Sequence, residues 1–367
     1  MQLNCGIVGL PNVGKSTIFS ALTSAPAEAA NYPFCTIEPN VGIVAVPDKR
    51  LYRLAEFIPP QKLIPAVTEF VDIAGLVKGA SKGEGLGNQF LGHIRQVGAI
   101  VHVVRCFDDP DIVHVSGTID PITDIETIEY ELALADLETV LKRRDALTKL
   151  AKSADKQVRE RAAILEPLLK ELEAALQDGR GARTLSLSAE QQEAIYDMHL
   201  ITMKKQLFCC NVDERGIHGG NEYVEKVKAY AGEDDVVTIC GKIESEIAAL
   251  ESAEERREFL NDLGLEESGL DRLIHTGYHL LDLQTYFTAG EKEIRAWTFG
   301  KGWKAPQAAG VIHTDFERGF IKAEVYHCED LFELGSEQKI KEAGRLRIEG
   351  KDYVVKDGDV MFFRFNV

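Results

Sequence analysis

The sequence predicts an α/β protein with a parallel-rich sheet, an inserted helical hairpin of the coiled-coil type and a small β-rich domain at its end. A glycine-rich loop follows an apolar strand near the start of the chain. Helical apolar spacing fills a long segment between two later strands, and short alternating stretches mark the last part. We place the sheet domain at residues 1–125 and 205–280, the insertion at 126–204 and the last domain at 281–367.

Composition limits the class of protein. A chain of 367 residues is too long for one compact core and suggests two or three domains. The formal charge of −17 argues against bulk electrostatic binding to nucleic acid, so any RNA contact would need a local patch. Since the sequence has neither a long apolar run nor the pattern of a secretory signal, we expect a cytoplasmic protein that has no membrane partner. We also expect it to be a monomer.

The phosphate-binding loop is the most specific motif. Gly9 to Ser16 matches G-x-x-x-x-G-K-[ST], between the predicted strand Asn4–Val8 and a predicted helix. Such a loop turns its N–H groups toward phosphate oxygens, Lys15 reaches the β- and γ-phosphates, and the Ser16 hydroxyl binds Mg²⁺. This predicts a P-loop nucleoside-triphosphatase domain, whose loop and first helical turn supply the nucleotide-binding residues Asn12, Val13, Gly14, Lys15, Ser16 and Thr17.

Two further segments resemble nucleotide-sensing switches. Thr36 lies in a polar loop where one threonine can complete the Mg²⁺ shell, although position alone leaves this about even. Asp72 ends a predicted strand and begins a D-x-x-G motif, so its carboxylate would hold Mg²⁺ through water and the Gly75 N–H would face the γ-phosphate. The glycine-rich residues 77–88 that follow are a switch or, less favoured, a flexible linker.

The catalytic group is the open question. Leu76 occupies the position where many small GTPases carry the glutamine that orients the attacking water. Another group, water held by backbone, or a partner protein must then assist hydrolysis. His114 is a candidate because histidine shuttles protons near neutral pH, and an ordinary surface histidine is the alternative. Lys15 and Gly75 complete the predicted catalytic set.

Base recognition favours adenine. Asn211-Val212-Asp213-Glu214 stands where a GTPase carries Asn-Lys-x-Asp. The Glu214 carboxylate lies one methylene farther out than the aspartate that binds guanine, and Val212 lacks the lysine stem that covers the ring. Asn211 can still bond the purine N6/N7 edge, so Asn211, Val212 and Glu214 are predicted base-site residues that prefer ATP over GTP.

Asn12 also occupies the loop position of a K⁺ ligand in related triphosphatases, so K⁺ is a second candidate cofactor beside Mg²⁺.

Together these motifs resemble the YchF or Obg-like ATPase family. The resemblance rests on Gly9–Ser16, Asp72–Leu76, Asn211–Glu214 and the run Lys301–Gly310, which spread across nearly the whole chain. It implies a G-domain of the OBG type, a helical insertion and a carboxyl-terminal TGS domain of ubiquitin-like α+β fold, with ATPase activity and ribosome association. It also implies that Thr36 is the switch threonine and Mg²⁺ ligand.

The insertion and the last domain offer surfaces for partners. Leucines recur at helical spacing from Leu165 to Leu176, which predicts an antiparallel hairpin that is either a spacer or a docking lever. A capping box at Ser188 should begin another helix. In the last domain, basic and aromatic groups could grip RNA, although half of them could be core aromatics or solvated charges. The RNA-binding candidates are Arg295, Lys301, Trp303 and Lys304.

Three functions remain to be weighed. The first is an ATP-hydrolysing switch of slow intrinsic turnover that binds a ribosomal subunit, large or small, and its rRNA, in translation or stress regulation. The second is a nucleotide-gated adaptor for protein partners, in which oxidation of Cys35 beside Thr36 changes partner choice. The other cysteines form no metal-like pattern and are expected to be reduced and buried. A small-molecule kinase is least favoured, because the sequence offers no acceptor site.

Overall fold

The structure is a computed structural model of the chain. Cys35, Thr36, Gly75 and Leu76, named above, lie outside the residues that it describes. The described residues are 3–24, 40–73, 86–114, 117–150, 156–231 and 235–366.

The described chain forms two compact units that alternate along the sequence. The first unit contains Met1–Ser24, Ile37–Gly42 and Phe70–Leu270, and the second contains Ile43–Glu69 and Asp271–Val367. Residues 43–69 therefore group with the end of the chain, whereas the predicted boundaries kept them in the sheet domain. Two strands, Val41–Ala45 and Val67–Asp72, each contain residues that belong to both units.

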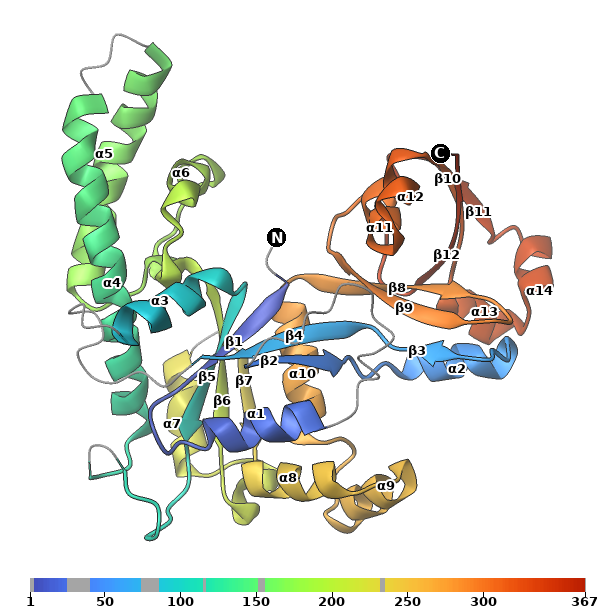
Figure 1. Ribbon diagram of the computed structural model, residues 1–367, viewed down its shortest axis with the longest axis horizontal. Helices are drawn as coiled ribbons and strands as arrows, with labels where there is room; N and C mark the ends of the chain where they lie inside the picture. Colours follow the sequence, from blue (N-terminus) through green and yellow to red (C-terminus); the bar gives the residue numbers. More distant parts are fainter. Residues whose placement is uncertain are drawn as a thin grey trace. The chain divides into compact units, whose positions relative to one another are not determined.

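A six-stranded sheet with neighbouring strands in the order β2-β4-β1-β5-β6-β7 forms the α/β part of the fold (Figure 1). The pairs β1–β5, β5–β6 and β6–β7 are parallel, which confirms the predicted parallel-rich sheet. Every residue of β5 is buried, as expected of a central strand with helices on both faces. The strands are β1 (Asn4–Val8), β2 (Val41–Ala45), β4 (Val67–Asp72), β5 (Ala99–Arg105), β6 (Lys205–Asn211) and β7 (Asp235–Ile239).

Helices cover this sheet because their apolar faces match its buried residues. Helices α1 and α8 pack against each other, and a buried cluster joins α7 and α8 to β5 and β6. The cluster includes Phe208, Val224 and Ile243. The helices are α1 (Lys15–Ser24), α3 (Leu86–Gln96), α7 (Glu222–Ala231), α8 (Gly241–Ala249) and α9 (Ala253–Asp262).

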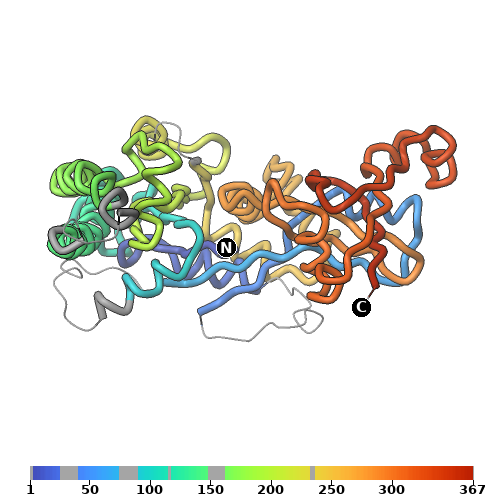
Figure 2. The backbone as a smooth tube through the Cα atoms, turned by 90° about the horizontal axis from the view of Figure 1, so that it is seen from above, coloured from blue at the N-terminus to red at the C-terminus, as the bar shows by residue number. Residues whose placement is uncertain are grey.

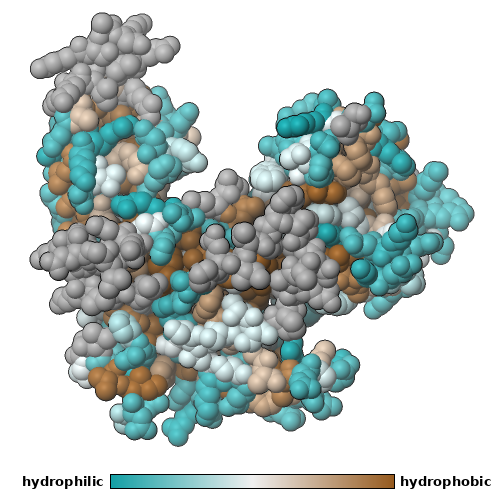
Figure 3. Space-filling model, viewed as in Figure 1, coloured by the Kyte–Doolittle hydropathy of each residue, from teal (hydrophilic) through white to brown (hydrophobic). Residues whose placement is uncertain are grey.

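The insertion is the predicted helical hairpin. Helices α4 (Pro121–Leu150) and α5 (Lys156–Gln177) lie side by side (Figures 1 and 2). They bury the leucine stripe between them. Hydrophilic side chains cover much of their visible outer surface (Figure 3). Helix α4 begins at Pro121, before the expected start of the insertion, since proline suits a first helical position. The predicted capping box is present, with Ser188 beginning α6 (Ala189–Ile195).

The second unit is built on a mixed sheet with the order β11-β10-β12-β8-β9-β3. Strand β10 pairs antiparallel with β12, and β12 pairs parallel with β8, so the predicted β-rich carboxyl-terminal region is confirmed. The core contains Tyr286, Phe299 and Val325 beneath α11 (Ala305–Ile312). The strands are β3 (Leu63–Ile64), β8 (Leu283–Ala289), β9 (Ile294–Gly300), β10 (Phe320–His327), β11 (Arg347–Glu349) and β12 (Asp359–Phe365). The remaining α-helices are α2 (Lys49–Phe57), α10 (Gly269–Leu280), α12 (Thr314–Arg318), α13 (Cys328–Leu334) and α14 (Glu337–Glu342).

An ion-pair network holds α2 in the second unit. The Arg50 guanidinium contacts Asp48, which caps α2, at 2.8 Å and Asp357, near the end of the chain, at 2.6 Å. Asp357 Oδ1 also accepts a 2.8 Å hydrogen bond from the Thr285 backbone N–H in β8. Arg50 therefore binds a carboxylate that lies 307 positions away in the sequence, and Thr285 binds the same carboxylate.

Of the described helices, none combines the length and apolar character that crossing a membrane requires.

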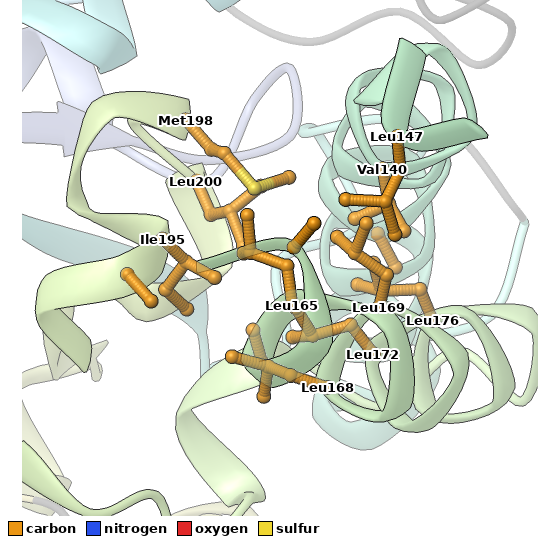
Figure 4. Packing of buried hydrophobic residues seen from close by; sticks show 14 residues of the cluster. Val140, Leu147, Leu165, Leu168, Leu169, Leu172, Leu176, Ile195, Met198 and Leu200 are labelled. Carbon is orange, nitrogen blue, oxygen red and sulfur yellow. The ribbon is translucent and has the colours of Figure 1, made fainter. Parts of the chain in front are cut away.

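Leu172→Ala tests the hairpin core. Leu172 is fully buried and packs with Val140 and Leu169 (Figure 4), so its truncation leaves a cavity. We expect a loss of about 2–5 kcal/mol of unfolding free energy, measured by chemical denaturation of the full chain. Glu171→Ala, at the exposed neighbouring position, is the matched control and should change stability by less than about 0.5 kcal/mol. Equal stability of the two variants would contradict the packing.

Candidate functional site

The loop from Gly9 to Ser16 connects β1 to α1, as predicted, and has the backbone shape of an anion site. Asn12 and Gly14 adopt left-handed backbone angles, with φ of 64° and 91°. A Cβ at Gly14 would lie 2.1 Å from Asn211 Nδ2, so a side chain is excluded there. Helix α1 begins at Lys15, which places the N–H groups of its first turn beside the loop.

Asn211, the last residue of β6, fastens this loop. Its Nδ2 donates to the Val13 carbonyl at 2.9 Å, and its Oδ1 accepts from the Gly241 N–H at 3.0 Å. Both ends of a buried amide are thus used to join the loop, β6 and α8. The structure gives Asn211 a positioning role that the sequence reasoning missed, and its contact with a purine edge stays a prediction.

The residues after Asn211 differ in how far they can reach a base. The Val212 side chain is buried in the cluster beneath α7 and α8, so very little of this residue is open to a base. Asp213 caps the following turn by accepting from the Gly216 N–H. Glu214 is exposed, and Lys242 Nζ lies 2.6 Å from its Oε1, which lowers the pKa of that carboxyl.

Sequence reasoning missed Lys242. It is the second residue of α8, directly after β7, and so lies at the same carboxyl edge of the sheet as Glu214. The signal was available, because the carboxyl ends of neighbouring parallel strands meet at one edge. At this edge Glu214 is therefore part of an ion pair and is not an isolated carboxylate.

Lys15 and Asp72 meet at the other side of the loop. The buried Lys15 ammonium forms an ion pair with the carboxylate of Asp72, the last residue of β4. Ser16 and Thr17 follow Lys15 in the first turn of α1 and are exposed. Among the described residues, no group of three or more histidine, cysteine or acidic side chains could hold a metal ion. The oxygen donors here are one carboxylate and one hydroxyl, a set that fits Mg²⁺ completed by phosphate and water.

His114 is buried, contrary to the alternative of an exposed loop histidine. Its side chain is 5% exposed, and Nε2 lies 2.9 Å from Asp124 Oδ2 in the first turn of α4. Burial raises the pKa of Asp124, and the hydrogen bond from His114 opposes that rise. The preceding Val113 carbonyl accepts from Asn12 Nδ2 at 3.1 Å. The structure thus brings the residue before His114 against the phosphate loop.

The RNA-binding candidates in the second unit differ in their contacts with the rest of the protein. The Arg295 guanidinium lies 4.1 Å from the ring centroid of Trp297 on β9, which forms a cation–π pair. Trp303 packs against the core beneath α11, and Lys304 pairs with Asp352 at 2.7 Å. Lys301 is exposed. Arg295 therefore places its charge against an aromatic ring, whereas the half-buried Trp303 packs against the core.

The described cysteines are all buried, as expected. Burial raises the pKa of Cys5 to about 12 and that of Cys209 well above its usual value. A hydrogen bond with Cys210, together with burial, also raises the pKa of Cys106. Thiols in this state are poor nucleophiles. Any redox role would thus fall to Cys35, which lies outside the described residues.

Comparisons with known proteins match the whole chain. A family model described as 50S ribosome-binding GTPase matches residues 4–152, and the model of the carboxyl-terminal domain of YchF GTPases, described as a protein of unknown function, matches residues 283–366. Proteins named ribosome-binding ATPase YchF are 58% identical in Bacillus subtilis and 56% identical in Escherichia coli O157:H7, with both chains covered completely. The structure of the Schizosaccharomyces pombe YchF GTPase aligns with a TM-score of 0.88 at 40% identity, over 99% of this chain and 98% of that one. This chain therefore belongs to the YchF family.

Proposed function

We propose that this protein is an ATP-hydrolysing molecular switch that prefers ATP over GTP and associates with ribosomes. The full-length relatives are named ribosome-binding ATPases, which supports the activity and the partner. The observation that carries the proposal is the phosphate loop, held by Asn211, with Glu214 at the base position. Association with rRNA and action as a monomer in the cytoplasm are parts of this proposal.

The base preference follows from hydrogen-bond geometry. Guanine binding in this class needs a carboxylate that accepts from N1–H and the 2-amino group together. The longer Glu214 side chain displaces its carboxylate, and Lys242 neutralises it. A guanine donor pair would have to compete with this ammonium, whereas adenine offers no such pair and loses nothing.

Direct titration tests the base preference. We expect ATP to bind at least about tenfold more tightly than GTP, which corresponds to about 1.4 kcal/mol. Lys242→Ala frees the Glu214 carboxylate and should narrow the ratio by improving GTP binding. Lys228→Ala breaks a similar exposed pair with Glu225 on α7 and is the control. Equal or tighter binding of GTP to the unaltered protein would contradict the proposal.

Mg²⁺ is the proposed cofactor, held by the Ser16 hydroxyl and, through water, by Asp72, with Thr36 as a third ligand. The ion would neutralise charge on the β- and γ-phosphates. The Lys15–Asp72 contact supports this, because it places the phosphate-binding cation and the metal-binding carboxylate together. K⁺ is a further proposed cofactor, bound by Asn12, whose Nδ2 already donates to Val113 and whose Oδ1 is a suitable ligand atom.

Removal of each ion separates the two cofactors. Chelating Mg²⁺ should abolish measurable hydrolysis, because the phosphate charge is no longer neutralised. Replacing K⁺ by Na⁺ at constant ionic strength should lower turnover if Asn12 binds K⁺, and Asn12→Ala should remove that difference. Turnover that is equal in the two salts would contradict the K⁺ site and leave the Mg²⁺ site standing.

Hydrolysis is proposed to be slow without a partner. Leu76 cannot hydrogen-bond water, and His114 is the proposed water-positioning or proton-accepting group. Its burial against Asp124 supports this role, because a buried carboxylate partner orients an imidazole. Lys15 and the Gly75 N–H would stabilise the γ-phosphate charge. His114→Ala is therefore expected to lower turnover more than ATP affinity.

Ribosome dependence distinguishes the switch from the adaptor. Purified ribosomes should raise the ATPase rate, and binding should weaken with salt because the acidic chain relies on a local basic patch. Lys301→Glu should reduce co-sedimentation with ribosomes, whereas the exposed Lys341→Glu, with the same charge change, should not. Unchanged rates with ribosomes, together with ATP-dependent capture of a protein, would favour the adaptor.

A further inference from the structure

Arg105, the last residue of β5, is a buried cation that the proposed chemistry does not use. Its side chain is among the largest fully buried ones, at 1% exposure. The guanidinium donates from Nε to Phe107 O at 3.2 Å, from Nη1 to Ile112 O at 3.0 Å and from Nη2 to Asp109 O at 3.1 Å. It also lies 4.6 Å from the centroid of the Phe107 ring.

These contacts organise the connection from residue 106 to residue 113. Residues 106–113 are neither helical nor extended, so their carbonyls need partners other than a ladder of backbone hydrogen bonds. One planar guanidinium satisfies three of them at fixed angles. At its start, the connection is fastened to β6, because the Cys106 N–H donates to Asn211 O at 2.7 Å. The connection is therefore wrapped around a single side chain.

The far end of the connection reaches the candidate site. Val113 O accepts from Asn12 of the phosphate loop, and His114, the next residue, bonds Asp124. The positive charge of Arg105 also acts on Asp124, where it opposes the effect of burial on the pKa of that carboxyl. Arg105 thus holds the backbone of the segment that carries both contacts.

We propose that Arg105 is a positioning residue for ATP hydrolysis, which holds residues 106–113 so that Val113 meets Asn12 and His114 meets Asp124. This inference rests on the proposed function. The phosphate loop itself does not depend on Arg105, since Asn211 fastens it from β6. Loss of the guanidinium fork therefore affects turnover before it affects nucleotide binding.

Arg105→Lys tests the role with charge retained. Lysine keeps the positive charge but loses the planar fork, so it cannot hold three carbonyls at these angles. We expect kcat to fall about tenfold, or by about 1.4 kcal/mol of activation free energy, with KM and the ATP Kd changed less than twofold. Amide hydrogen exchange should accelerate in residues 106–113. Arg183→Lys alters another arginine that donates to a backbone carbonyl, Lys204 O, and should change none of these values.

The second variant, His114→Ala, separates the inference from the proposed function. If Arg105 acts through His114, adding Arg105→Lys to His114→Ala lowers kcat no further. If His114→Ala retains full turnover, the role of His114 is wrong, while faster exchange and lower kcat in Arg105→Lys still support positioning through Val113 and Asn12. Normal kcat in Arg105→Lys, or equal losses in kcat and ATP affinity, would overturn the inference. If Arg105→Lys proves unstable, amide hydrogen exchange of residues 106–113 in this variant, measured under native conditions, tests the inference instead. If these residues exchange no faster than β5 and β6 of the same variant, the inference is overturned.

Discussion

The hydrogen bonds of one buried amide hold the nucleotide site together. Asn211 joins the Val13 carbonyl to the Gly241 N–H, and it approaches Gly14 so closely that only glycine fits. Removing one partner of such a buried pair leaves the other unsatisfied, which costs about 1–3 kcal/mol for each group. The phosphate loop, the base segment and the start of α8 therefore depend on the same side chain, and the site forms as one unit.

Near Asn211, two buried charged side chains, Arg105 and Asp124, bind partners in the irregular segment after β5. Arg105 binds carbonyls, and Asp124 binds His114, so neither group is buried without partners. Burying a charge is costly unless hydrogen bonds compensate it. Such groups are found where the chain leaves regular structure, here between β5 and α4. Next to the phosphate loop, hydrogen bonds from the Arg105 side chain thus hold the backbone of residues 106–113 where no strand or helix does.

Local patterns explain which parts of the structure were predictable. The loop from Gly9 to Ser16 and the leucines from Leu165 to Leu176 carry their signal in spacing, and both were confirmed. The burial of Val212 could not be predicted, because an apolar residue beside a motif can face the core or the ligand, and only packing decides. The position of Lys242 beside Glu214 depends on which strand ends are neighbours in the sheet, and sequence periodicity does not show this. Strand β3 is only two residues long, which is too short for a periodic pattern.

Strand β3 bears on how this protein could have been assembled from parts. Leu63 and Ile64 pair with β9, and Arg50 binds Asp357, so the sheet at the end of the chain incorporates a segment from near its beginning. The matched carboxyl-terminal family region, residues 283–366, lacks both pieces. Taken alone, that region would have an open edge at β9, and the Asp357 carboxylate would lack its arginine partner. Residues 43–69 and the end of the chain therefore form one unit, although residues 70–270, which lie between them in the sequence, belong to the other unit.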